Sequence, residues 1–128
     1  VISFDGSEEY ARHTRNLLGA HGVQADVRVS KLAPYKSSNG WYDPKSFSDL
    51  KKIDLLVVDG PEGGEDSNGR YPALDVLLSK LSPKAIVILD DVKRDGERRL
   101  AEDFAKALPN HIIDFLDHEK GTAVIRPK

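Results

Sequence analysis

The sequence predicts one α/β domain, residues 1–128, built on a doubly wound, mostly parallel sheet with an antiparallel hairpin at its C-terminal edge. Short apolar runs typical of strands alternate with segments in which apolar residues recur at helical spacing. The run at residues 53–58 is almost continuously apolar, which is typical of a strand in a parallel sheet that is covered on both faces. The chain is long enough for one hydrophobic core and too short for two domains.

The first part of the chain has the pattern of a strand, a helix and a second strand. Residues 1–4 are apolar and largely β-branched, and Asp5-Gly6 ends the run with a turn. Ser7 suits the N-cap of a helix whose apolar face comprises Tyr10, Thr14, Leu17 and Leu18. Residues 26–31 alternate between apolar and polar side chains, which indicates the next parallel strand.

Residues 33–52 are polar and are interrupted by Pro and Gly, which predicts mostly loop with about one turn of helix. This stretch contains the aromatic pair Trp41-Tyr42. Such a pair can stack on a flat ligand, but it more often covers a hydrophobic core, and we favour the second interpretation.

The second half repeats the alternation and ends in a hairpin. Pro72 suits the first turn of a helix that carries Leu74, Leu77, Leu78 and Leu81 on one face. Residues 85–89 read as a buried strand, and Asp95 can cap a helix with the inward residues Leu100, Phe104, Ala107 and Leu108. Residues 111–117 and 122–126 flank a Gly-containing turn and predict an antiparallel pair.

Composition narrows the function classes. The net charge is −2 at pH 7 with both signs interspersed, so we expect no nucleic-acid partner. No apolar run approaches the ~20 residues of a membrane span, so we expect no membrane partner. Cysteine is absent, which fits the reducing cytoplasm, where we place the protein. The chain begins at Val1 within an apolar run and contains no methionine, so we expect it to be a piece of a longer chain.

Several familiar site patterns are missing from the sequence. It has no Walker lysine motif, no G-x-S-x-G elbow and no H-E-x-x-H motif. The histidines show no metal-ligand spacing and fall mostly on predicted surfaces, so we assign no chemistry to His13, His21, His111 and His118.

Carboxylates follow three of the predicted parallel strands, at Asp5, Asp59 and the pair Asp90-Asp91. The carboxyl ends of parallel strands share one edge of the sheet, and ligands of such folds bind outside that edge. Gly60, Gly63 and Gly64 let the chain pass close to a ligand there, or simply turn. An Asp after a strand is often only a turn former, so both interpretations stay open for each carboxylate.

These segments, taken in order, resemble a known family. "VISFDGSEEYARHTRNLL", "IDLLVVDGPEGG", "RYPAL" and "AIVILDDVKRDGE" resemble class I S-adenosylmethionine-dependent methyltransferases of Rossmann-like fold. They are most similar to bacterial proteins of the "methyltransferase domain 24" type and more distantly similar to catechol and caffeoyl-CoA O-methyltransferases. The resemblance runs from the family's second strand to its seventh. The family's first strand and Gly-rich loop are missing, which implies an N-terminally truncated version of the fold.

The resemblance implies a site for the methyl donor S-adenosylmethionine. Asp5 matches the carboxylate that holds the ribose hydroxyls, which a carboxylate can accept in a fork. Asp59, followed by Gly60, matches the acid beside the transferred methyl group. The segment after the family's third strand lies on the adenine side of the donor, and here it is Ser30, Lys31 and Leu32.

The resemblance also raises the question of a metal. In the O-methyltransferases the acid matching Asp59 binds a divalent cation together with an Asp-Asn pair, and this chain has Asp90-Asp91 at that pair. Mg²⁺ prefers such oxygen ligands. The alternative is a metal-free turn neutralised by Lys93 or Arg94. The family's lysine base does not carry over, because Glu62 stands in its place.

The function implied is transfer of a methyl group to an oxygen or nitrogen of a small-molecule acceptor. A non-catalytic Rossmann-like nucleotide-binding module is one alternative, and a nicotinamide-dependent enzyme is another, because an acid after a second strand also suits that cofactor's ribose. We expect the 128-residue piece alone to bind the donor poorly and to be inactive. The groove left by the missing strand would stay open, or would be filled by strand shifting or by self-association, as in a homodimer.

Overall fold

The computed structural model describes residues 1–62 and 64–128 and confirms the α/β class. Gly63, expected to help the loop turn, lies outside the described residues. In chain order the elements are β1 (Ile2–Asp5), α1 (Glu8–Ala20), β2 (Asp26–Val29), β3 (Leu32–Tyr35), β4 (Ser38–Tyr42), the 3₁₀ helix η1 (Pro44–Phe47), β5 (Ile53–Val58), α2 (Pro72–Leu77), the 3₁₀ helix η2 (Leu78–Lys80), β6 (Leu81–Asp90), α3 (Asp95–Ala107), β7 (His111–Leu116) and β8 (Thr122–Pro127).

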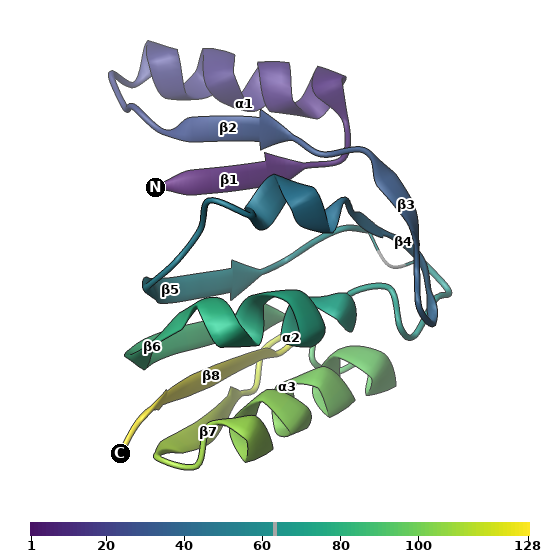
Figure 1. Ribbon diagram of the computed structural model, residues 1–128, viewed down its shortest axis with the longest axis vertical. Coiled ribbons are helices and arrows are strands. Elements are labelled where there is room, and N and C mark those ends of the chain that lie inside the picture. The colour runs from purple at the N-terminus through teal and green to yellow at the C-terminus, as the bar shows by residue number, and fades with distance from the viewer. Residues whose placement is uncertain (63) are drawn as a thin grey trace.

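The predicted strand directions are confirmed. β1 pairs with β2 and β5 pairs with β6, both in parallel, while β8 pairs antiparallel with β6 and with β7. Within the described part of the chain, hydrogen bonding divides the strands into the pair β1-β2, the hairpin β3-β4 and the sheet β5-β6-β8-β7. β1 and β5 are thus in separate sheets, although their arrowheads lie on the same side of the molecule (Figure 1).

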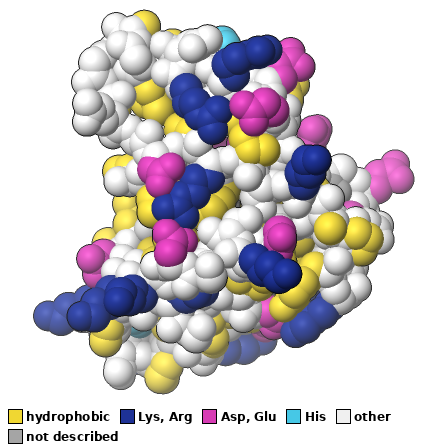
Figure 2. Space-filling model, turned by 45° about the horizontal axis from the view of Figure 1, so that its top comes forward, with side chains coloured by type: hydrophobic (Ala, Val, Ile, Leu, Met, Phe, Trp, Pro, Cys, Tyr) yellow, Lys and Arg dark blue, Asp and Glu magenta, His cyan; other side chains and the backbone are white. Residues whose placement is uncertain are grey.

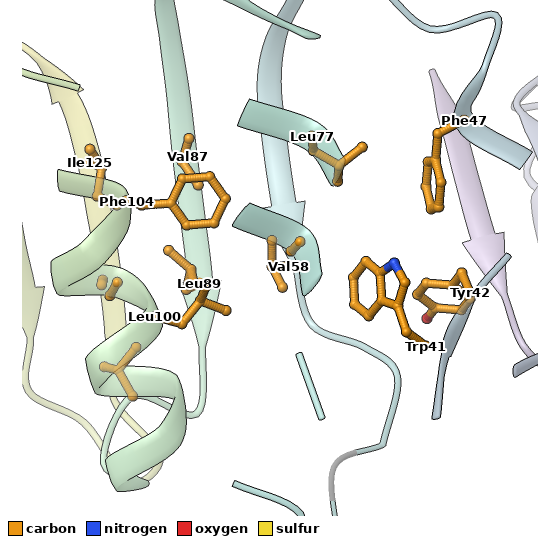
Figure 3. Packing of buried hydrophobic residues seen from close by; sticks show 14 residues of the cluster. Trp41, Tyr42, Phe47, Val58, Leu77, Val87, Leu89, Leu100, Phe104 and Ile125 are labelled. Atoms are coloured by element: carbon orange, nitrogen blue, oxygen red, sulfur yellow. The ribbon is translucent and has the colours of Figure 1, made fainter. Parts of the chain in front are cut away.

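The main core lies between the four-stranded sheet and the helices α2 and α3. Leu100 and Phe104 of α3 pack toward Val87, Leu89 and Ile125 of the sheet (Figure 3). The core extends past Val58 and Leu77 to the aromatic cluster, which consists of Trp41, Tyr42 and Phe47. The ring of Phe47 lies 4.4 Å from that of Phe4, measured between centroids, so this cluster connects β1 to the rest of the molecule.

We expected both faces of β5 to be covered, but the structure covers only one of them. Side chains alternate between the faces of a strand, so Val58 is buried while Leu55 and Val57 point the other way. Leu55 and Val57 are each 57% exposed, and Ile86 of the neighbouring β6 is also exposed. The expectation that the apolar face of α1 packs into the core is also wrong, because Tyr10 and Leu17 are mostly exposed.

The region expected to be mostly loop contains a β-hairpin. β3 and β4 pair antiparallel, with Leu32 opposite Tyr42 and Ala33 opposite Trp41. Trp41 is only 2% exposed, so the interpretation of the aromatic pair as core cover is confirmed. Pro34 and the polar residues Ser38 and Asn39 hide the strand character in the sequence, and burial of the aromatic rings stabilises the hairpin nevertheless.

Two helix boundaries also differ from the prediction. The helix that begins at Pro72 ends at Leu77, and a 3₁₀ turn follows, so Leu81 already belongs to β6. Arg94 occupies the N-cap of α3, and Asp95 is instead in the first turn, where the helix dipole still favours its charge. Ser7 caps α1 as expected, since its Oγ accepts a hydrogen bond from the Tyr10 N–H at 3.4 Å.

Candidate functional site

Asp5 is the last residue of β1 and lies at the carboxyl end of the β1-β2 pair. Its Oδ1 accepts a hydrogen bond from the Ser7 N–H at 2.8 Å, so the carboxylate does form the turn into α1. A carboxylate offers about four acceptor positions, and one N–H bond does not exhaust them. The turn-forming role and a role in binding hydroxyl groups are therefore compatible.

Asp59, Asp90 and Asp91, which we call the acidic cluster, are brought together by the parallel pairing of β5 with β6. One carboxylate oxygen from each lies within 4.8 Å of the others. Asp59 is 66% exposed at its side chain, whereas Asp91 is buried and has a positive φ of 62°. The sequence predicted one shared sheet edge for Asp5 and these three carboxylates. The structure brings the three together, while Asp5 ends a strand of the separate β1-β2 pair.

The pKa values of Asp59 and Asp90 are shifted in opposite directions. Partial burial raises the pKa of Asp59, the Arg70 guanidinium opposes that rise, and the charges of the other two carboxylates add to it. The pKa of Asp90 is lowered, first by the backbone N–H of Asp91 and then by the hydroxyl of Thr122, which donates at 3.2 Å. The fold therefore favours the ionised form of Asp90.

Arg70 is the residue of this site that sequence reasoning missed. It precedes α2 and is only 5% exposed at its side chain. Its Nη1 lies 3.1 Å from Asp91 Oδ2, and its Nη2 lies 3.9 Å from Asp59 Oδ1. Arg94, which was expected to neutralise the cluster, approaches the same oxygen of Asp91 at 3.7 Å from the solvent side.

The other cation proposed from the sequence, Lys93, pairs instead with Asp117, at 3.0 Å. The only hint of Arg70 in the sequence was a single basic residue at the end of an acidic, Gly-containing loop.

The Tyr42 hydroxyl is a second group that the sequence did not place here. A Cβ on Gly60 would lie 2.6 Å from this hydroxyl, so glycine is needed for the tyrosine to approach the chain after Asp59. Burial raises the pKa of Tyr42 to about 12, and the neighbouring carboxylates of Asp5 and Asp59 contribute to the rise. The Tyr42 hydroxyl therefore lies next to the chain that follows β5.

The segment after β2 is divided between core and surface. Ser30 is buried, where its Oγ lies 2.7 Å from Ser46 Oγ and accepts a hydrogen bond from the Asp43 N–H. Lys31 and Leu32 are exposed, and Leu32 lies against Gly6 beside Asp5. A groove of about 550 Å³ opens at this end of β2, and its lining includes Ser30, Lys31, Tyr35, Trp41, Tyr42 and Asp43.

We expected the histidines to lie mostly on the surface, but His111 is buried. It is buried at the start of β7, and its Nε2 lies 2.9 Å from the carbonyl oxygen of Ala85. His118 is exposed and its Nε2 lies 2.7 Å from Thr122 Oγ1, which itself donates to Asp90. Neither residue is part of the acidic cluster.

The surface agrees with the dispersed charge of the sequence. On the face shown in Figure 2, basic and acidic side chains lie interspersed over the β1-β2 unit and the four-stranded half. Among the residues that the structure describes, none belongs to a helix of the length and apolarity needed to cross a membrane.

Comparison with known proteins identifies the fold. No protein-family model and no curated protein sequence matches this chain. Solved structures do match along nearly its entire length, at sequence identities below 20%, and most of those compared are methyltransferases. The chain therefore has the Rossmann-like fold of class I methyltransferases, as the resemblance implied.

Three of these structures illustrate the likeness. An O-methyltransferase from Bacillus cereus in complex with SAH matches with a TM-score of 0.72 and 19% identity, over 100% of this chain and 62% of its own. A methyltransferase from Geobacter sulfurreducens matches with a TM-score of 0.68 and 14% identity, and the match covers 99% of this chain and 57% of that protein. A precorrin 8w decarboxylase from Methanobacterium thermoautotrophicum matches with a TM-score of 0.60 and 19% identity, and the match covers 100% of this chain and 69% of that protein. This chain thus spans about three fifths of the length of the first two.

Proposed function

We propose that the protein is an S-adenosylmethionine-dependent methyltransferase that acts on an oxygen or nitrogen of a small-molecule acceptor. The observation that carries this proposal is the position of Asp5 and Asp59 at the carboxyl ends of β1 and β5, whose arrowheads lie on the same side of the molecule (Figure 1). Ligands of open α/β sheets bind outside the carboxyl ends of the strands. The likeness to a methyltransferase in complex with SAH supports the choice of donor.

In this proposal Asp5 accepts hydrogen bonds from the ribose hydroxyls of the donor. Its Oδ1 is already oriented by the Ser7 N–H, which fixes the carboxylate before the ligand arrives. Asp59, exposed at the end of β5, lies beside the reacting methyl group, and the absence of a side chain on Gly60 leaves room there for the Tyr42 hydroxyl. The groove beside Ser30 and Lys31 has a volume within the usual range of ligand sites and takes the adenine side.

The reaction is a displacement at the methyl carbon of the sulfonium. The acceptor's lone pair forms the new bond to that carbon while the carbon–sulfur bond breaks, so its electron pair stays on sulfur and the acceptor's proton is released. Catalysis by orientation alone can contribute ~7–11 kcal/mol. The residues of this chain orient the donor. Glu62 is exposed and stands at the position where the similar O-methyltransferases have a lysine base.

We expect the 128-residue chain by itself to bind the donor weakly. β1 and β5 are not paired with each other among the described residues, and Ile2, Leu55 and Val57 expose apolar surface on these strands. A donor that contacts both Asp5 and Asp59 needs the two strand ends at a fixed separation. Self-association of the chain, as a homodimer, is one way to cover this apolar surface.

Calorimetry of the complete protein with S-adenosylmethionine tests the proposal. Asp5→Ala should weaken binding roughly 10- to 150-fold, because charge-assisted hydrogen bonds contribute ~1.5–3 kcal/mol. Asp5→Asn should retain part of the affinity, because its amide keeps one acceptor oxygen. Asp26→Ala is the matched control, since Asp26 lies at the opposite end of the same strand pair and contacts Arg28.

The other functions give different results in the same experiment. Binding of a nicotinamide cofactor in place of S-adenosylmethionine would identify a nicotinamide-dependent enzyme. Binding of the donor without transfer to any of a panel of phenols and amines would identify a nucleotide-binding module. Unchanged donor affinity in Asp5→Ala would restrict Asp5 to forming the turn.

A further inference from the structure

The position of Arg70 bears on whether a metal binds the acidic cluster. The proposed donor site borders on Asp59, Asp90 and Asp91, whose oxygens lie close enough together to suit a cation. Arg70 enters this cluster from the loop before α2 and is 5% exposed at its side chain. A buried guanidinium always carries its charge, so it must be paired with acceptors where it lies.

Neutral acceptors hold the guanidinium in place independently of the carboxylates. Its Nε donates to the carbonyl oxygen of Pro61 at 3.1 Å, and its Nη1 donates to the carbonyl oxygen of Asp90 at 3.4 Å. These two bonds tie the loop after β5 to the end of β6. They also direct the fork of the guanidinium toward Asp91 and Asp59.

The donor set in this arrangement does not fit Mg²⁺. That ion needs near-octahedral oxygens at about 2.0–2.1 Å. Asp91 Oδ2 is already 3.1 Å from Arg70 and 3.7 Å from Arg94, and Asp90 Oδ1 accepts from Thr122. A dication bound between Asp59 and Asp91 would lie next to the buried positive charge of Arg70.

We propose that the Arg70 guanidinium supplies the positive charge that a divalent cation would otherwise supply to the acidic cluster, so that these carboxylates bind no metal. Arg70 is then a positioning residue: it neutralises Asp91 and holds the turns after β5 and β6 together, which leaves Asp59 exposed at the donor edge. This inference deepens the proposed function, but its test requires neither the methyl donor nor activity.

The test measures Mn²⁺ and Mg²⁺ binding by calorimetry, and thermal unfolding with Mg²⁺ or with a chelator. The wild-type chain should show no saturable binding and the same melting temperature in both conditions. Arg70→Gln removes the charge and leaves the carboxylates uncompensated, so it should bind Mn²⁺ saturably, with a bound fraction at least about tenfold that of wild type at the same Mn²⁺ concentration. Its melting temperature should fall in chelator and partly recover in Mg²⁺.

Arg94→Gln is the matched control. It removes a charge near the same Asp91 oxygen, but from a half-exposed side chain, so it should leave metal binding and the response to chelator unchanged. Arg70→Lys keeps the charge and should remain indifferent to metal. If Arg70→Gln does not fold, the wild-type measurement still decides the question: saturable Mn²⁺ binding at micromolar concentration that is lost in Asp90→Asn would overturn the proposal.

Discussion

The strand–helix–strand unit of residues 1–29 and the four-stranded half of residues 53–127 differ in how completely they bury their apolar side chains. The first unit buries only Ala11 and Val27 among its residues. The second buries large side chains such as Leu89, Leu100 and Phe104 almost completely. Both contain parallel strands and amphipathic helices, so local pattern does not decide burial. What differs is the number of layers that each has packed against it.

The aromatic cluster is the link between these two regions. Phe47 contacts Phe4 of β1, and Trp41 and Tyr42 join the core of the four-stranded half. Asp5 comes from the weakly covered region, while Asp59, Arg70 and the rest of the acidic cluster come from the well-covered one. The proposed donor site therefore joins one region with a well-buried core to one that buries few side chains.

The largest expected effect separates the two regions by stability. Phe104→Ala should lower the free energy of unfolding by ~3–5 kcal/mol, because it leaves a cavity under α3. Leu17→Ala on the exposed face of α1 should change it by about 0.5 kcal/mol or less. Urea unfolding followed by circular dichroism measures both. Similar losses for the two variants would mean that α1 is covered in solution.

Two helical glycines sharpen the comparison. A Cβ on Gly96 in α3 would lie 2.0 Å from the carbonyl oxygen of Ser67, so Gly96→Ala should destabilise by ~1–3 kcal/mol or more. Apart from the neighbouring backbone of α1, no atom of the described residues lies within 4 Å of a Cβ on Gly19, so Gly19→Ala should stabilise by ~0.4–1 kcal/mol. Shifts of melting temperature in opposite directions are expected, and a loss in Gly19→Ala would contradict the open surroundings of α1.

The contact between α2 and α3 gives a pH-dependent prediction. The Tyr71 hydroxyl donates to Asp103 at 2.7 Å and, with Lys106, lowers the pKa of Asp103. A lowered carboxyl pKa stabilises the fold above the ordinary value of about 3.9, and this contribution is lost as the pH falls. Tyr71→Phe should therefore cost ~0.5–1.5 kcal/mol at pH 7 and less at pH 3.

Urea titrations of Tyr71→Phe and wild type at the two pH values measure this difference. Glu8→Gln in the first unit is the control, because its pairing with Arg15 is exposed and should contribute almost nothing. An equal cost of Tyr71→Phe at both pH values would show that the hydrogen bond to the carboxylate is not its cause.

The smallest stability effect is expected on the exposed face of β5. Leu55→Thr with Val57→Thr keeps a strand-compatible surface at two positions that are 57% exposed, so stability should change by about 0.5 kcal/mol or less. If this face drives self-association, the double variant should elute as a smaller species in light-scattering chromatography at high concentration. An unchanged molar mass above that of one chain would place the interface elsewhere.

The sequence by itself determined the parallel strands, the C-terminal hairpin and the sheet edge where Asp59, Asp90 and Asp91 gather. The apolar runs at 53–58 and 85–89 predict strands through local periodicity, and Asp59 and Asp90 follow those strands directly. The two apolar runs around a Gly-containing turn also predict the C-terminal hairpin, since β7 and β8 are joined by a short turn and pair with each other. These features depend on residues close together in the chain, which is why pattern alone reveals them.

Only the tertiary structure decided which side chains enter the site and which faces stay open. The β3-β4 hairpin forms because Trp41 and Tyr42 find a core built by distant residues, and that packing places the Tyr42 hydroxyl beside Gly60. Arg70 reaches Asp91 across 21 residues of chain, and no spacing rule connects them. Leu55 is exposed although its sequence reads as buried, because burial depends on which layer packs over a strand, and local periodicity carries no information about that layer.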